Sequence, residues 1–143
     1  MQSLLTSSIH KFTAQRIFSN NDIGKNQNVS LEYIPPDDRD AGGLPLHINL
    51  SVGTKVMLIR NLNVEYGLVN GALGTVTQLN LHNNSEPTID VVFPDIDLPS
   101  AITDLPRSVK IMQYDQEYLF NGRYIIRRNF PLLPCWATTI HKV

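Results

Sequence analysis

Residues 50–76, LSVGTKVMLIRNLNVEYGLVNGALGTV, form the stretch that decides the fold of this 143-residue chain. Residues 55–60 are an apolar run of strand length with polar ends, and residues 74–79 alternate in polarity and are rich in β-branched side chains. Between them, Asn70-Gly71 favours a tight turn, because glycine accepts positive φ without steric cost. The stretch therefore predicts two β-strands joined by a structured loop.

Further strands are predicted on the C-terminal side of this stretch. Residues 88–93 follow a polar loop, residues 109–114 form another strand pattern, and residues 123–127 are entered through Asn121-Gly122, a strong hairpin signal. Five short strands separated by turn signals favour a mostly β protein, either a small barrel or a sandwich. The side chains expected to point inward are Val56, Leu58, Val76, Val91 and Ile126.

The two flanks have a different character. Residues 19–45 are polar and rich in proline and aspartate, which predicts a long connection with one strand at residues 31–34. Residues 9–14 alternate like a strand, although the absence of acidic residues from the first 21 positions also resembles a mitochondrial presequence. At the other end, residues 134–143 can form a strand or a helix, and a proline followed by apolar residues at helical spacing favours a short helix.

The charge of the chain is unevenly distributed. Residues 1–106 hold six Lys and Arg against eleven Asp and Glu, a balance of −5, whereas residues 107–143 hold six against two, a balance of +4. A local basic segment can contact a polyanion, and it can equally be the solvated face of a strand. No apolar stretch approaches the roughly 18 to 20 residues of a membrane span, so we expect no membrane partner.

Motifs for catalysis are absent from the sequence. It contains neither the GxxxxGK(S/T) phosphate loop nor GxGxxG, and no nucleophile motif surrounds any serine. The four histidines and the single cysteine match no common zinc spacing. Cys135 lies in an apolar run, where a buried, inert thiol is favoured over a nucleophile. We therefore predict that this chain alone is not a complete enzyme and holds neither a cofactor nor a metal.

Residues 50–76 closely resemble the segment L-x-V-G-x-x-V-M-L-x-R-N…G-L-x-N-G-x-x-G-x-V of the Pif (petite integration frequency) family of superfamily-one DNA helicases. Residues 125–143, IIRRNFPLLPCWATTIHKV, resemble a second family segment, I-x-R-x-Q-F-P-L-x-x-A-W-A-x-T-I-H-K. In that segment Asn129 stands where Gln is usual, and Cys135 stands where Ala is usual. Residues 1–14 are similar to the lead into the family's domain 2B, so the resemblance covers nearly the whole chain in family order.

The resemblance implies a domain organisation. Domain 2B of the family is a barrel that resembles the Src-homology-three fold and is inserted into the second, α/β motor domain. On this pattern residues 1–45 are a stub of that motor domain with a connecting segment, residues 46–130 are the 2B barrel, and residues 131–143 are the truncated start of helicase motif V. The chain is then expected to be a fragment that lacks the ATPase motifs of the family and is inactive without them.

Candidate nucleic-acid-binding residues also follow from the resemblance. Thr139, His141 and Lys142 match motif V positions near the DNA backbone, where Thr and His can hydrogen-bond to phosphate and Lys adds charge. Arg127 and Arg128 belong to the basic segment and are expected to contribute to the same contact.

Three further residues fall at family-typical positions in the barrel, namely Arg60, Asn61 and Asn70. For Arg60 and Asn61 two roles are equally favoured, namely bracing the barrel and contacting DNA. For Asn70 a role in forming the turn is favoured over contact with a ligand.

The function implied by the resemblance is that of part of a 5′-to-3′ DNA helicase acting in genome maintenance, DNA repair, recombination or telomere maintenance. The expected location is the nucleus or the mitochondrion. The expected partners are single-stranded DNA, bound weakly, and the remainder of the motor, which binds ATP and Mg in the intact family. Two alternatives are a stand-alone barrel that acts as a protein-interaction module and an uncharacterised enzyme.

Overall fold

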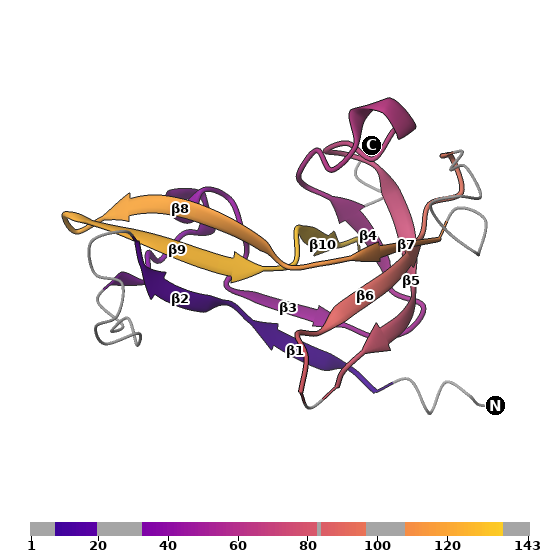
Figure 1. Ribbon diagram of the computed structural model, residues 1–143, viewed down its shortest axis with the longest axis horizontal. Coiled ribbons are helices and arrows are strands. Elements are labelled where there is room, and N and C mark those ends of the chain that lie inside the picture. The colour runs from indigo at the N-terminus through magenta and orange to yellow at the C-terminus, as the bar shows by residue number, and fades with distance from the viewer. Residues whose placement is uncertain (1–7, 20–32, 83, 97–107, 136–143) are drawn as a thin grey trace. The chain divides into compact units, whose positions relative to one another are not determined.

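The computed structural model describes residues 8–19, 33–82, 84–96 and 108–135. The described residues are mostly β, as predicted, and their packing divides the chain into two compact units. Unit 1 consists of Met1–Lys11, Asn49–Met112 and Pro131–Val143, and unit 2 consists of Phe12–Ile48 and Gln113–Phe130. Each unit contains an antiparallel sheet of its own (Figure 1).

Unit 1 is built on a five-stranded antiparallel sheet in the order β10-β4-β5-β6-β7. Its strands are β4 (Lys55–Leu58), β5 (Leu73–Asn80), β6 (Thr88–Val92), β7 (Ser108–Ile111) and β10 (Leu132–Pro134). Val76 lies opposite Val91 and Ile89 lies opposite Ile111, and all four side chains are buried or nearly so. Apolar pairs of this kind on one face supply the core of the unit.

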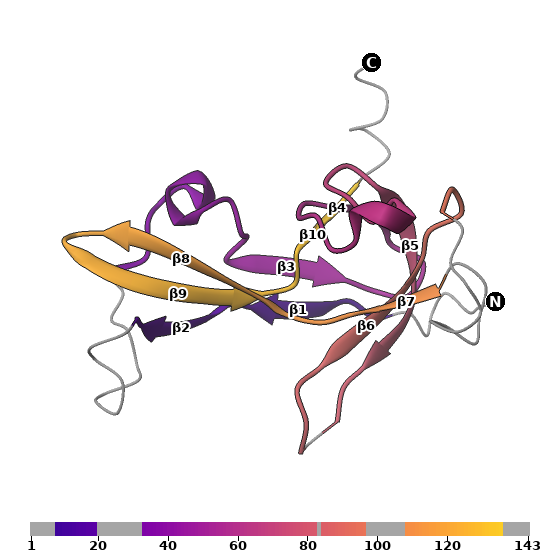
Figure 2. The ribbon, with the colours of Figure 1, turned by 45° about the horizontal axis from the view of Figure 1, so that its top comes forward.

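The long β5–β6 hairpin changes register within β5 (Figure 2). Its pairing shifts between Val76 and Gln78, which leaves Thr77 as the extra residue of a bulge. The bulge turns the polar Gln78 to the outer face opposite Asp90, and it returns Leu79 to the inner face opposite Ile89. The apolar inner face of the sheet therefore continues past the irregularity.

The loop between β4 and β5 is held by short-range hydrogen bonds. It contains the 3-10 helix η5 (Val64–Tyr66), which ends at Gly67 with a φ of 85°. The Ala72 N–H donates to the Val69 carbonyl at 2.9 Å, and Gly71 has a φ of 104°. A positive φ at the third residue of such a turn is the reason for glycine at this position.

Unit 2 contains a three-stranded antiparallel sheet in the order β2-β9-β8. The strands of this sheet are β2 (Gln15–Phe18), β8 (Tyr114–Phe120) and β9 (Arg123–Asn129). A separate two-stranded sheet, which belongs to neither unit as a whole, pairs β1 (His10–Thr13) with β3 (His47–Leu50). Asn121 and Gly122 join β8 to β9 with φ values of 52° and 78°. Two successive positive φ values define the tight hairpin turn that the Asn-Gly pair predicted.

A 3-10 helix, η4 (Asp38–Ala41), packs against β8 in unit 2. Ala41, Tyr118 and Ile125 form a buried cluster, and Phe18 and Tyr33 are among the residues packed against it. The Tyr118 hydroxyl donates to the Tyr33 carbonyl at 3.0 Å. The core of this unit is therefore small, aromatic and partly polar.

Most of the predicted strands are confirmed. The runs at 55–60, 74–79, 88–93 and 123–127 correspond to β4, β5, β6 and β9. The run at 109–114 is wrong as a single strand, because β7 ends at Ile111 and β8 begins at Tyr114. The strand predicted at residues 9–14 is present as β1.

One inward-facing residue was assigned to the wrong side of its strand. Val56, Leu58, Val76 and Val91 are buried as predicted, whereas Ile126 is only half-buried and its neighbour Ile125 is fully buried. Side chains alternate between faces along a strand, so the inner face of β9 carries residues 125, 127 and 129.

Two predictions about the flanks also differ from the structure. The helix expected to begin at Pro134 does not begin there, because Pro134 lies in β10 opposite Val56; residues 136–143 lie outside the described residues. A proline is tolerated at this place since β10 is an edge strand of its sheet. Tyr33 and Ile34 are not in a strand, and the rest of the predicted strand at 31–34 lies outside the described residues.

The units divide the chain at other residues than the expected domain boundaries. Residues 113–130 were expected in the barrel of residues 46–130 but pack within unit 2, because β8 and β9 pair with β2. Residues 131–135 were expected to begin motif V, and Leu132–Pro134 adds an edge strand to the sheet of unit 1. Closure of this sheet into a Src-homology-three-like barrel stays a prediction. Within the described ranges, no helix is both long and apolar enough to cross a membrane.

We expect Gly74→Ala to destabilise unit 1. A Cβ atom at this position would lie 2.6 Å from Val91 Cγ1 and 2.8 Å from the Val92 carbonyl oxygen, so β5 and β6 would have to separate. The expected loss is about 1–3 kcal/mol of unfolding free energy, measured by urea denaturation. Gly71→Ala is the control, because a Cβ atom there meets no atom within 4 Å and only the φ of 104° opposes it. A Gly74→Ala variant as stable as the unchanged chain would contradict the steric explanation.

Candidate nucleic-acid interface

Arg127 occupies the inner face of β9 and is fully buried. Its Nη1 atom donates to Asp38 Oδ1 at 2.8 Å and to the Leu44 carbonyl at 2.8 Å, and its guanidinium carbon lies 5.6 Å from the centre of the Tyr118 ring. A phosphate contact needs a solvent-facing guanidinium, so this position does not agree with the expected contact between Arg127 and DNA. Arg127 instead holds the segment of η4 to the sheet of unit 2.

Arg128 faces the opposite side of β9 and forms a two-pronged ion pair. Its Nε donates to Asp115 Oδ1 at 2.6 Å and its Nη2 donates to Asp115 Oδ2 at 3.0 Å. These two residues lie opposite each other in the β8–β9 register. A phosphate would have to compete with this carboxylate for the same guanidinium.

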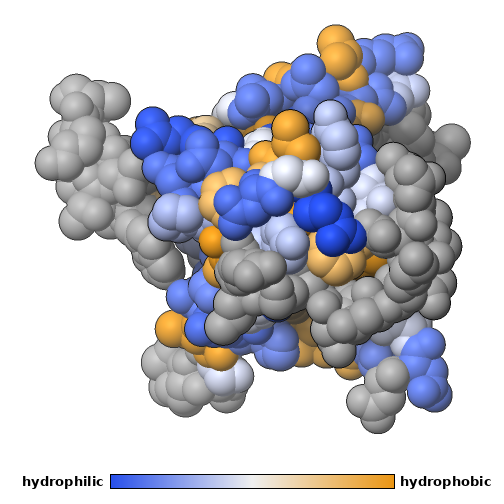
Figure 3. Space-filling view, turned by 90° about the vertical axis from the view of Figure 1, so that its left-hand side faces the viewer, coloured by the Kyte–Doolittle hydropathy of each residue, from blue (hydrophilic) through white to orange (hydrophobic). Residues whose placement is uncertain are grey.

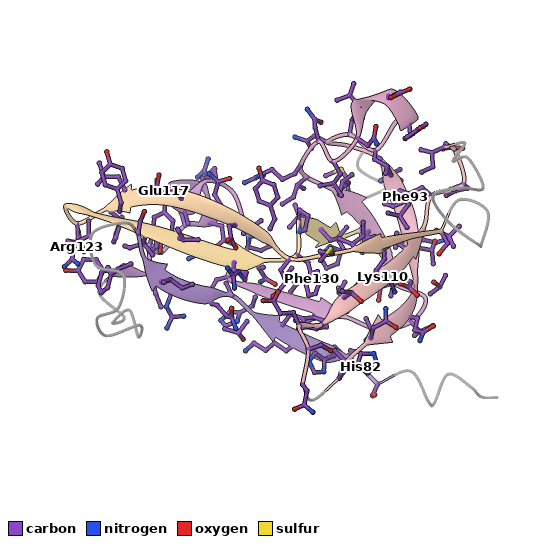
Figure 4. All side chains as sticks on the ribbon, in the orientation of Figure 1. His82, Phe93, Lys110, Glu117, Arg123 and Phe130 are labelled. Atoms are coloured by element: carbon purple, nitrogen blue, oxygen red, sulfur yellow. The ribbon has the colours of Figure 1, made fainter. Side chains whose placement is uncertain are left out.

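The other described cations of the basic segment also contact their own chain. Lys110 on β7 pairs with Asp90 at 3.3 Å, and Arg123 lies over the Phe18 ring with its guanidinium carbon 4.1 Å from the ring centre (Figure 4). Arg107 and Lys142 lie outside the described residues. Of the four cations of this segment that the structure describes, Lys110, Arg127 and Arg128 are therefore each paired with a carboxylate, and Arg123 lies over an aromatic ring.

The described surface is mostly hydrophilic on one side of the molecule. On the side of the molecule that faces the viewer in Figure 3, hydrophilic residues cover most of the described surface and hydrophobic residues appear singly between them. Acidic and basic side chains of unit 2 alternate in pairs such as Arg39 with Asp37 and Arg128 with Asp115.

Arg60 and Asn61 follow β4 and contact the backbone. The Arg60 Nη1 atom donates to the Ile59 carbonyl at 2.8 Å, and Asn61 Oδ1 accepts the Asn70 N–H at 2.8 Å. The bond from Asn70 fixes the Asn70-Gly71 turn to the end of β4. These contacts support the bracing alternative for both residues, and their contact with DNA stays a prediction.

The Asn70-Gly71 turn also lines an open pocket of about 440 Å³ in unit 1. The buried Phe93 and Ile96 contribute to its wall, and Asp95 adds a carboxylate (Figure 4 labels Phe93). Asn70 thus combines the predicted turn with a position on a pocket wall. Thr139, His141 and Lys142 lie outside the described residues, so the motif V contact stays a prediction.

Four ionisable groups of the described residues have a displaced pKa, and one of them is Arg39, whose pKa is raised by its hydrogen bond with Asp37. Burial raises the pKa of the Tyr118 hydroxyl and that of the Cys135 thiol above their ordinary values. The hydrogen bond from the Arg39 side chain lowers the pKa of Asp37 to about 2. A raised pKa keeps Cys135 in the thiol form, which agrees with an inert cysteine, although the residue is half-buried and not fully buried. No group of three or more His, Cys, Asp or Glu side chains suited to a metal occurs among the residues that the structure describes.

Two structural residues were not identified from the sequence. Asp38, the partner of Arg127, lies in a polar run that predicted only a connection. Asn129 is fully buried, its Nδ2 donates to the Pro45 carbonyl at 3.1 Å, and its Oδ1 accepts the Phe130 N–H at 2.8 Å. The spacing of Arg127 and Asn129 could have indicated this role. Residues two positions apart in a strand lie on the same face, and here both lie on the buried face of β9.

Comparison with known sequences identifies the region. Residues 40–79 match the family described as DNA helicase Pif1, 2B domain. The ATP-dependent DNA helicase PIF1 of Danio rerio is 34% identical over 98 residues, which is 66% of this chain and 13% of that protein. The protein of the same name from Rattus norvegicus is 32% identical over 95 residues, again 66% of this chain and 13% of that protein. The resemblance of the chain to the 2B region of Pif-family helicases is confirmed.

Solved structures of the family share the fold. The crystal structure of Pif1 helicase from Candida albicans is 23% identical, with a TM-score of 0.55 over 95% of this chain and 31% of that chain. The structure of unliganded Pif1 from Bacteroides sp is 24% identical, with a TM-score of 0.55 over 94% of this chain and 34% of that chain. The chain thus spans only a small part of the Pif proteins that it matches.

We expect Asp38→Asn to destabilise unit 2 by about 2–3 kcal/mol. The substitution leaves the buried Arg127 guanidinium without its carboxylate, and a buried charge without a counter-charge is costly. Asp37→Asn is the matched control, since it changes the adjacent residue in a pair that is exposed to solvent. Urea denaturation of both variants measures the difference. A midpoint shift of the same size in both would show that the Arg127 pair contributes little.

Tyr118 should make the native state sensitive to alkali. Its pKa is raised in the folded chain, so the unfolded chain loses the phenolic proton first once the pH exceeds 10, and stability falls as the pH rises through the folded pKa. Tyr118→Phe should flatten this part of the curve of urea midpoint against pH. Tyr124→Phe is the control, because Tyr124 is exposed on the other face of the hairpin. Identical curves for the two variants would contradict the effect of burial.

Proposed function

We propose that the chain acts as the 2B region of a Pif-like 5′-to-3′ DNA helicase and contributes contact with single-stranded DNA. The observation that carries this proposal is the match of residues 40–79 to the Pif1 2B family together with the 34% identity to the Danio rerio helicase. ATP hydrolysis with Mg would belong to the remainder of the motor, because the chain contains no phosphate loop. The remainder of the motor is then the protein partner of this region.

The DNA contact is proposed for the residues of the second family segment that follow Cys135. Thr139 and His141 would hydrogen-bond to the DNA backbone, and Lys142 would neutralise a phosphate. Arg128 and Arg60 would add electrostatic attraction from positions where they already contact their own chain. Arg127 is left out of the proposal, since its guanidinium is buried.

The biological setting is also a proposal. DNA repair, recombination and telomere maintenance are the processes that the family resemblance implies, in the nucleus or the mitochondrion. In support, one structure of 23% identity and a TM-score of 0.50 concerns DNA unwinding at forked duplex DNA by two coordinating Pif1 helicases.

The chain should bind labelled oligothymidylate weakly in fluorescence anisotropy. Because several cations are already paired within the chain, we expect the chain to neutralise only two or three DNA phosphates. The logarithm of the association constant should then fall against the logarithm of the salt concentration with a slope of about −2. We expect a dissociation constant of about 10⁻⁴ M or weaker at physiological salt. Lys142→Ala should reduce the slope by about 0.7, and the control Lys55→Ala, which removes an exposed lysine held by Thr75, should leave it unchanged. Sub-micromolar or salt-independent binding would contradict the proposal.

A further inference from the structure

The loop between β4 and β5 forms part of the wall of the open pocket of about 440 Å³ in unit 1. Val69 and Ala72 come from this loop, Leu73 begins β5, and Phe93 and Ile96 come from the turn that follows β6. Leu73 is 57% exposed, so apolar surface lies open to solvent at the pocket. Ligand sites commonly measure about 300–1,000 Å³ and have mostly apolar walls with a few polar groups, which is the character of this pocket.

The walls of the pocket are fixed by backbone hydrogen bonds. The Gly71 N–H donates to the Leu58 carbonyl at 2.7 Å, and the Leu58 N–H donates to the Ala72 carbonyl at 2.8 Å, so two bonds join the loop to β4. The Ile96 N–H donates to the Phe93 carbonyl at 3.2 Å and closes the turn after β6. Walls held in this way lose little conformational freedom when a ligand binds, which favours affinity.

The pocket carries a negative charge. Asp95 is exposed and lines the pocket, and none of the lining residues in the described part of the chain is basic. Asp38, Asp90 and Asp115 are each paired with a cation, whereas the Asp95 carboxylate has neither an ion pair nor a hydrogen bond within the described ranges. The exposed Asn70 amide adds a second polar group to the wall.

These features discriminate between classes of occupant. A purely apolar group would remove water from the Asp95 carboxylate without replacing its hydrogen bonds, which is costly. A phosphate or a second carboxylate would be repelled by the same charge. A cation on an apolar stem meets both conditions, because the stem covers the apolar walls and the charged end reaches the carboxylate.

We propose that this pocket is a docking site for an arginine side chain of a partner polypeptide. The planar guanidinium donates two parallel hydrogen bonds to a carboxylate, whereas the ammonium of lysine acts as a point charge. Leu62, Val64 and Leu73, all exposed, supply apolar surface in and beside the same loop for the neighbours of that arginine. All of these residues belong to unit 1, and the docking does not depend on the proposed contact with DNA.

N-acetyl-arginine amide is the first probe, and the citrulline derivative is its neutral isostere. Titration of the isotope-labelled full chain, followed by NMR, should shift the amide signals of Gly71, Ala72 and Asp95 in a saturable manner with a dissociation constant of about 1 mM. The citrulline derivative should bind about tenfold more weakly, and the lysine derivative about threefold more weakly. The absence of a saturable shift, or shifts spread over both units, would overturn the proposal.

Substitution of the carboxylate tests its role. Asp95→Asn should weaken the binding of N-acetyl-arginine amide about tenfold and remove the preference over citrulline. Glu86→Gln is the matched control, because it removes the same charge from an exposed residue of unit 1 that does not line the pocket, and it should keep both the affinity and the preference. Equal losses in the two variants would show only a general effect of net charge and would overturn the site.

Peptides distinguish a partner polypeptide from a free guanidinium compound. A capped Leu-Arg-Leu peptide should bind about tenfold more tightly than a capped Ser-Arg-Ser peptide, because its apolar side chains cover apolar surface such as that of Leu73. Leu73→Ser should reduce this difference, whereas Asp95→Asn should weaken both peptides. Equal affinity of the two peptides and of N-acetyl-arginine amide would indicate a site for a free guanidinium compound and would overturn the docking of a polypeptide.

Discussion

The buried charge of Arg127 is the constraint on which the rest of unit 2 depends. A guanidinium group without solvent needs a counter-charge and hydrogen bonds, and Asp38 and the Leu44 carbonyl supply both to its Nη1 atom from a segment more than eighty positions earlier in the chain. The polar connection between β2 and β3 is thereby fixed to β9 over the small cluster around Tyr118 and Ile125. Because this cluster is small, polar contacts determine the position of the connection as much as apolar burial does.

Ion pairs within the fold also change how the net charge of the basic segment, residues 107–143, should be interpreted. Its net charge suggested a surface for a polyanion, but the fold brings a carboxylate to Lys110, Arg127 and Arg128 in turn. Two of these three carboxylates, Asp38 and Asp90, belong to residues 1–106, so a count by segment separates charges that the fold brings together. The weak, salt-sensitive affinity for DNA that we propose rests on this pairing more than on the overall charge.

The sequence predicted the strands whose apolar residues alternate or cluster, and it failed where polar residues face inward. β4, β5 and β6 carry apolar inner faces, and the turn at Asn121-Gly122 has the residues that its φ values require. In β9 the inner positions are Ile125, Arg127 and Asn129, so a search for apolar alternation selects Ile126 on the wrong face. The partners of buried polar groups come from distant segments, which local pattern cannot identify, and for this reason Asp38 was missed.

Asn129 shows how a departure from the family pattern is accommodated. The family usually has Gln at this position, and Asn is one methylene shorter, yet its amide nitrogen still reaches the Pro45 carbonyl and its oxygen accepts the next backbone N–H. Both bonds lie in the interior, where an unpaired amide would be costly. Arg127 and Asn129 thus use the first half of the second family segment to stabilise unit 2, and Leu132 continues it into β10 opposite Leu58 in unit 1. Since the described half of this segment stabilises the fold, we place the proposed hydrogen bonds to DNA in the residues that follow Cys135.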